Sequence, residues 1–144
     1  MAKVFPNEKI HNYIFSELDS NNGLELVNSQ SKEAIVFDER ETSWIFTFEK
    51  ADSPIKVLLT ISDPLYFCDV SFYQNETEHF TLNSYLKNTA QSIELEKVLD
   101  SFMDDNISEE EYTMSFLNIF KKYLGSCEVQ EIISATYWPD VPSE

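Results

Sequence analysis

The sequence predicts an α+β domain with an N-terminal helix, a four- to five-stranded antiparallel meander, and two to three C-terminal helices packed on one sheet face. Three observations lead to this prediction. Residues 24–74 alternate apolar and polar side chains with a period of two, which is typical of half-buried strands. No segment long enough for a helix separates these strands, so neighbouring strands are expected to be antiparallel. The flanking segments instead carry apolar residues at helical spacing.

The first expected helix spans residues 8–20. Asn7 precedes it as a candidate N-cap, because its side-chain oxygen can accept a backbone N–H of the first turn. The apolar face of this helix is formed by Ile10, Tyr13, Ile14 and Leu18. The Asn-Asn-Gly sequence at 21–23 is expected to end the helix, since both residue types tolerate a left-handed backbone.

Strand signals follow at residues 24–27, 33–37, 43–49, 55–62 and 65–74. They are rich in β-branched and aromatic residues, which pack well on a pleated surface. The expected breaks are polar or proline-containing turns at 28–31, 38–41, 52–54 and 62–64. In the last strand, Asp69 and Tyr73 share the face opposite the apolar one, while Trp44 in the third is expected in the core.

The second half of the chain is expected to be mainly helical. Residues 82–86 predict a short helix or turn, and residues 92–104 a longer helix. A further helix begins at Ser108, because Ser108 and Glu111 have the spacing of a capping box, and it ends at Gly125. Residues 127–138 fit either a helix or a strand. No linker-like or repeated segment divides the chain, so residues 1–144 are expected to form a single domain.

The composition excludes several classes of function. The chain has 26 acidic and 10 basic residues, a net charge of −16, and its basic residues are scattered, which argues against direct binding of nucleic acid or an anionic membrane. No apolar run approaches the roughly 20 residues of a membrane span, and no signal peptide is visible at the start of the sequence. Cys68 and Cys127 form no CxxC motif and are expected to be free thiols, which favours a cytoplasmic location.

Motifs for catalysis or cofactor binding are not found. The two glycines cannot form a phosphate-binding loop. Residues 104–115 lack the central glycine and final glutamate of a calcium-binding EF-hand loop. An enzyme remains an alternative only through His79 with Glu76 or Glu78, where nothing nearby completes a metal site. We therefore expect no catalytic residue, cofactor or metal.

In size, acidity, α+β character and lack of catalytic motifs, the chain resembles the small acidic immunity proteins of bacterial toxin systems. The resemblance implies a non-catalytic inhibitor that neutralises a basic toxin partner, commonly a nuclease. Two alternatives remain open, a dimeric secretion-chaperone-like protein and a DNA-mimic inhibitor, and the oligomeric state is not predicted. Acidic residues and exposed aromatics are the expected contacts to a basic protein. The candidate partner-binding residues are Asp69, Tyr73, Glu76, Glu78, Asp104, Asp105, Glu109, Glu110 and Trp138.

Overall fold

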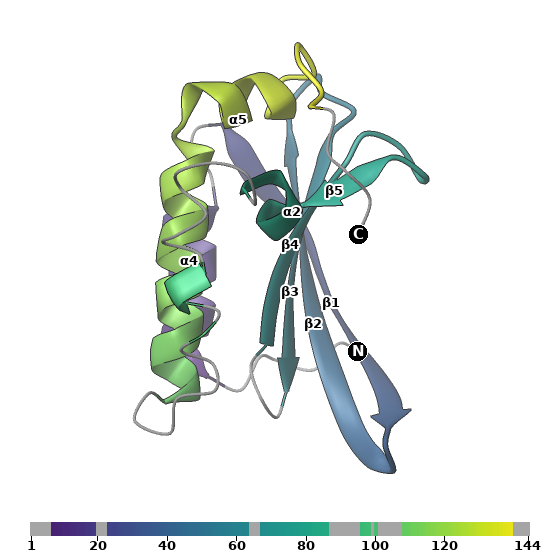
Figure 1. Ribbon diagram of the computed structural model, residues 1–144, viewed down its shortest axis with the longest axis vertical. Coiled ribbons are helices and arrows are strands. Elements are labelled where there is room, and N and C mark those ends of the chain that lie inside the picture. The colour runs from purple at the N-terminus through teal and green to yellow at the C-terminus, as the bar shows by residue number, and fades with distance from the viewer. Residues whose placement is uncertain are drawn as a thin grey trace.

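The protein consists of one antiparallel sheet with helices on one of its faces (Figure 1). The computed structural model describes residues 7–19, 23–63, 67–86, 96–98, 100 and 108–139. The strands follow one another in the sheet in the order β1-β2-β3-β4-β5, and each neighbouring pair is antiparallel. This arrangement confirms the predicted α+β class, with its N-terminal helix, its meander and its C-terminal helices.

The first hairpin differs from the prediction. Strand β1 (Leu24–Val36) is continuous, so the predicted turn at 28–31 is wrong. Strand β2 (Glu39–Lys50) is long enough to pair with all of it, and these backbone hydrogen bonds override the polar composition of the segment. A bulge between Leu26 and Asn28 interrupts the register. The predicted turn at 38–41 is also wrong in position, because the chain already reverses at Phe37 and Asp38.

The remaining strands are β3 (Lys56–Asp63), β4 (Phe67–Tyr73) and β5 (His79–Thr81). The first two match their predicted positions to within a few residues. β5 was not predicted, because three residues are too few to show a period-two pattern. It pairs with the end of β4, where Ser71 lies opposite Thr81 and Tyr73 opposite His79.

Two of the described helices begin at the predicted caps. Helix α1 (Glu8–Tyr13) has Asn7 as its N-cap, whose Oδ1 accepts the Ile10 N–H at 3.0 Å. It continues into the π-helix η1 (Ile14–Leu18). Helix α2 (Leu82–Leu86) is short, as expected. Helix α4 (Glu109–Leu124) is capped by Ser108, whose Oγ accepts the Glu111 N–H at 3.1 Å.

The ambiguous segment 127–138 begins as helix α5 (Cys127–Ile133), so its helical alternative is correct there. Of the predicted helix at 92–104, residues 96–98 and 100 are described and are helical, and its other residues lie outside the described part of the chain.

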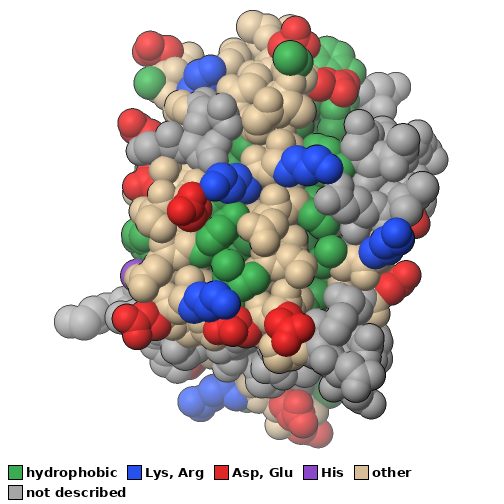
Figure 2. Space-filling model, turned by 90° about the vertical axis from the view of Figure 1, so that its left-hand side faces the viewer, with side chains coloured by type: hydrophobic (Ala, Val, Ile, Leu, Met, Phe, Trp, Pro, Cys, Tyr) green, Lys and Arg blue, Asp and Glu red, His purple; other side chains and the backbone are tan. Residues whose placement is uncertain are grey.

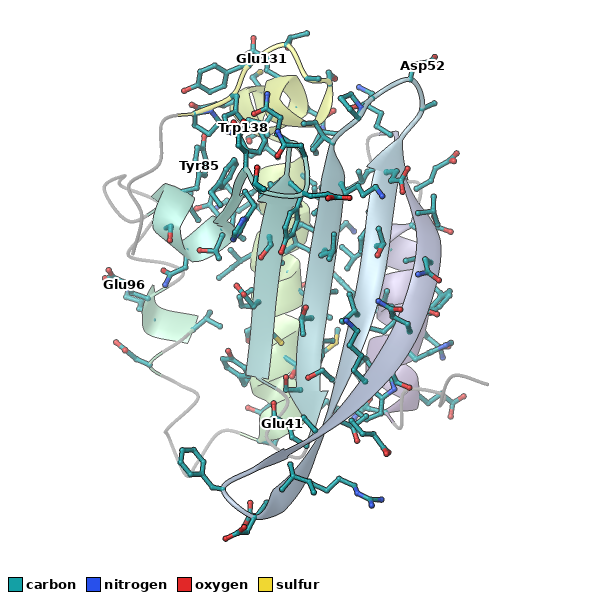
Figure 3. All side chains as sticks on the ribbon, turned by 90° about the vertical axis from the view of Figure 1, so that its right-hand side faces the viewer. Glu41, Asp52, Tyr85, Glu96, Glu131 and Trp138 are labelled. Atoms are coloured by element: carbon teal, nitrogen blue, oxygen red, sulfur yellow. The ribbon has the colours of Figure 1, made fainter. Side chains whose placement is uncertain are left out.

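The core lies between the sheet and the helices. Trp44, Phe46 and Phe48 alternate along β2 toward this side, and Trp44 is 6% exposed, as predicted. The ring of Phe48 contacts Phe120 of α4 edge-on, with centroids 6.2 Å apart. The other face of the sheet is the one seen in front in Figure 3, with the helices behind it.

Candidate protein-binding face

The two faces of the sheet have different chemistry. The helix-covered side of β3 and β4 carries six buried residues: Val57, Leu59, Ile61, Cys68, Val70 and Phe72. The side chains between them point to the other face, which we call the open face, and are mostly half-buried: Lys56, Leu58, Thr60, Ser62, Asp69, Ser71 and Tyr73. The open face is therefore a mixture of hydroxyl, aliphatic and charged groups that the described helices do not cover (Figure 3).

A hollow of about 330 Å³ lies at one end of the open face. It is lined by Pro54, Lys56, Leu58, Tyr73, Asn75 and Glu76. Pairing across β3 and β4 explains part of this set, because Lys56 is directly opposite Tyr73 and Leu58 is opposite Ser71. The volume is at the lower end of the range of about 300–1,000 Å³ that is typical of ligand pockets. It suits a single side chain of a partner protein or a small molecule.

The rim of the hollow is an acidic loop between β4 and β5, which the side chain of Asn75 holds by hydrogen bonds. The Asn75 Oδ1 accepts the backbone N–H of Thr77 and that of Glu78, both at 2.9 Å, and the Thr77 hydroxyl at 3.0 Å. The Asn75 Nδ2 also donates to the Glu78 Oε1 at 3.2 Å. A single asparagine thus organises the loop, and this leaves both Glu76 and Glu78 exposed at the edge of the sheet.

His79 has a structural contact in this region. Its ring stacks on Tyr73 with centroids 4.8 Å apart and an interplanar angle of 17°. The stack holds the phenol ring that lines the hollow. Among the described residues, no three His, Cys, Asp or Glu side chains are grouped so that they could hold a metal ion.

Four predicted contact residues thus lie on or beside the open face. Tyr73 and Glu76 line the hollow, and Glu78 is in the loop beside it. Asp69 lies further along β4, opposite Thr60 and outside the hollow. Strand alternation brings Asp69 and Tyr73 to one face, and the short β5 returns the chain beside them.

The other predicted contact residues lie elsewhere. The Glu110 carboxylate accepts the Asn7 Nδ2 at 3.3 Å and is 3.9 Å from the Lys9 Nζ, so it ties α4 to the start of α1. Trp138 is half-buried and packs on Phe80, with ring centroids 4.9 Å apart. Of the rest, Asp104, Asp105 and the side chain of Glu109 lie outside the described part of the structure.

Carboxylates concentrate in connections at opposite ends of the sheet. At one end the turn after β1 brings Asp38, Glu39 and Glu41 together with Arg40, and at the other lie the β4–β5 loop and Asp52. Figure 3 shows Asp52 and Glu41 at these two ends. The open face therefore has negative charge at both of its ends.

On the helix side, in contrast, acids and lysines are interspersed (Figure 2). Lys121 of α4 pairs with Glu17 of η1 at 2.8 Å, and this hydrogen bond raises the pKa of the Lys121 ammonium. Together with the Lys9–Glu110 contact, the pair joins the two helical elements. These carboxylates have partners within the fold.

Several residues of the open face were missed by the sequence analysis. Pro54, Lys56 and Leu58 form half of the lining of the hollow, but none belongs to a motif. The sequence predicts Phe37 at the end of a strand, whereas it lies in the turn and is 96% exposed. Its neighbour Asp38 was the available signal, because aspartate is common in tight hairpin turns.

The buried titratable groups of the core are inert. Burial raises the pKa of the Cys68 thiol to about 12, with a smaller opposing effect from a hydrogen bond with Thr113. Burial also raises the pKa of the Tyr112 hydroxyl. These groups remain protonated near neutral pH and belong to the scaffold.

Within the described residues, no helix is both long and apolar enough to cross a membrane. Comparison of the chain with family models, curated proteins and solved structures finds no match.

Proposed function

We propose that this protein is a non-catalytic, acidic protein-binding domain of the immunity type, which neutralises a positively charged toxin domain in the cytoplasm. The observation that carries the proposal is the open face itself. It combines an aromatic-lined hollow with acidic connections at both ends of the sheet. Negative charge would steer a basic partner toward this face, and the hollow would take up one of its side chains.

The hollow suits a cationic or aromatic side chain of such a partner. The Tyr73 ring offers a face for a cation or for stacking, while Leu58 supplies an apolar surface. The Glu76 carboxylate is placed to pair with a lysine or arginine. A net charge of −16 adds long-range attraction that salt would screen.

Binding to the products of neighbouring genes tests the proposal. The native chain should capture one basic protein and abolish its toxic activity, and the association rate should fall as salt rises from 20 to 500 mM. Charge reversal in Glu76→Lys should weaken binding at least tenfold, which is about 1.4 kcal/mol. The matched control is Glu111→Lys, an exposed acid on α4, which should change affinity less than twofold.

Other results would reject the immunity function. A salt-insensitive association rate, or equal effects of the two charge reversals, would contradict binding through the open face. An obligate dimer that binds an extended effector segment would favour the secretion-chaperone alternative. Displacement of the partner by duplex DNA would favour the DNA-mimic alternative. Turnover that is lost in His79→Ala but kept in His11→Ala would identify an enzyme.

A further inference from the structure

The β1–β2 hairpin extends beyond the rest of the sheet. The last pair that joins β2 to β3 is Thr42 with Asp63, so residues 34–41 pair only within their own hairpin. We call these residues the arm, and Figure 1 shows it projecting past the ends of β3 and β4. Among described residues, no helix or third strand covers it, and the side chains of residues 34, 35 and 37–40 are exposed.

The tip of the arm carries two large apolar side chains in water. Phe37 is 96% exposed, and Ile35 is 78% exposed. Scattered apolar residues on a surface need no explanation, but two of this size on one free tip form an apolar surface that the described fold does not use.

The backbone conformation at the tip is also unfavourable for phenylalanine. Val36 pairs with Glu39, so Phe37 and Asp38 are the two central residues of the turn. Both have positive φ, +50° and +65°, as in a type I′ hairpin turn. Such turns favour Asn, Asp or Gly, because a bulky side chain is disfavoured in the left-handed region. Phe37 is unfavourable in its own turn and packs on no described core residue. This combination indicates that its side chain has a function other than stabilising the fold.

The charges of the arm indicate what it contacts. Asp38, Glu39 and Glu41 outnumber Arg40, so the apolar tip has an acidic rim. A second copy of this chain would bring another −16 charge against it. An anionic membrane would be repelled by the same rim.

We infer that the arm is an anchor that enters a concave, apolar pocket ringed by lysine and arginine on the positively charged partner of the proposed function. Phe37 and Ile35 fill the pocket, and the acidic rim pairs with the surrounding cations. Buried aromatic anchors of this kind commonly dominate the binding energy of an interface. The inference rests on the proposed function, but it concerns the other end of the sheet from the hollow. The arm lies beyond the Thr42–Asp63 pair, whereas the hollow lies at the Lys56–Tyr73 pair.

The test uses a photo-crosslinking amino acid in the full chain, placed in separate proteins at position 37, 73 or 137. Position 137 is the matched control, because Tyr137 is an exposed aromatic outside both surfaces. The expected result is a crosslink from position 37 to one positively charged protein, mapped to a basic cleft on it. The control position should not give that product.

Affinity for the same purified protein gives the second criterion. Phe37→Asn should weaken binding at least tenfold while the melting temperature stays equal or rises, since asparagine suits the turn. Ile35→Thr should weaken binding three- to tenfold, and Tyr137→Asn less than twofold. Both criteria must be met to support the inference.

Failure of the inference and failure of the proposed function give different results. Crosslinking of a basic protein from position 73 alone, or unchanged affinity in Phe37→Asn, would overturn the anchor and leave the proposed function intact. Crosslinks from position 37 to a second copy of the chain or to an acidic protein would overturn the anchor as stated. No crosslink from either position would count against both.

Discussion

The turns at the two ends of β2 differ in residue type and in their attachment to the rest of the fold. Both contain a residue other than glycine at positive φ, Phe37 before β2 and Asp52 after it. Asp52 is a residue type that tolerates this conformation, and its turn is held by α5. The Ser53 Oγ donates to the Ile133 carbonyl at 2.6 Å, and the Lys50 Nζ donates to the Ser134 Oγ at 2.7 Å.

In the turn before β2, Asp38 also tolerates its positive φ but Phe37 does not, and no described helix holds this turn. The turn projects from the sheet, and the Phe37 side chain is in solvent. The difference shows that the same strand serves two purposes. The end at Asp52 is hydrogen-bonded to the helices and stabilises the fold. The end at Phe37 carries an exposed aromatic residue that does not stabilise the fold. Three changes test how far this division extends along the sheet.

The largest effect is expected where β2 lies under α4. Phe48→Ala should lower the free energy of unfolding by about 3–5 kcal/mol, because Phe48 is fully buried against Phe120 and its removal leaves a cavity. The matched change on the arm, Ile35→Ala, should cost less than about 0.5 kcal/mol. Urea denaturation of both variants measures the difference. Equal losses would mean that the arm is part of the core.

The two cysteines differ in burial and should therefore differ in reactivity. Burial raises the pKa of Cys68 from 9.0 to about 12, which lowers its thiolate fraction about a thousandfold, whereas Cys127 is exposed. Labelling of the native protein with a disulfide reagent at pH 8 should therefore modify Cys127 rapidly and Cys68 only after denaturation. Cys127→Ser should abolish the fast phase. A fast phase that persists in this variant would show that the helix layer opens over β4.

The smallest effect is expected at the fastened turn. Ser53→Ala removes the hydroxyl that donates to Ile133 and accepts the Ile55 N–H at 3.2 Å, which should cost about 1 kcal/mol in thermal or chemical unfolding. The control is Ser29→Ala in β1, an exposed strand position that should change stability by less than about 0.5 kcal/mol. If Ser53→Ala were as mild as this control, the attachment to α5 would not distinguish the two turns.

Much of the fold could be predicted because its signals are local. Asn7 and Ser108 cap their helices through hydrogen bonds to residues three positions away, so sequence spacing was sufficient to find them. The alternation along β4 likewise assigned Asp69 and Tyr73 to one face. The contacts of Glu110 to Asn7 and Lys9 could not be predicted, because they join residues about a hundred positions apart.

The sequence by itself determined the fold class, the helix caps and the faces of the strands, since each depends on neighbours within a few residues. Only the tertiary structure decided that β1 is one strand, that Lys56 and Tyr73 share a hollow, and that Phe37 is a bare tip. These features depend on strand pairing and register, and on how far one hairpin extends beyond the neighbouring strand. The length of each strand depends on the pairing energy between segments that are distant in sequence. The periodicity within one segment does not indicate that energy.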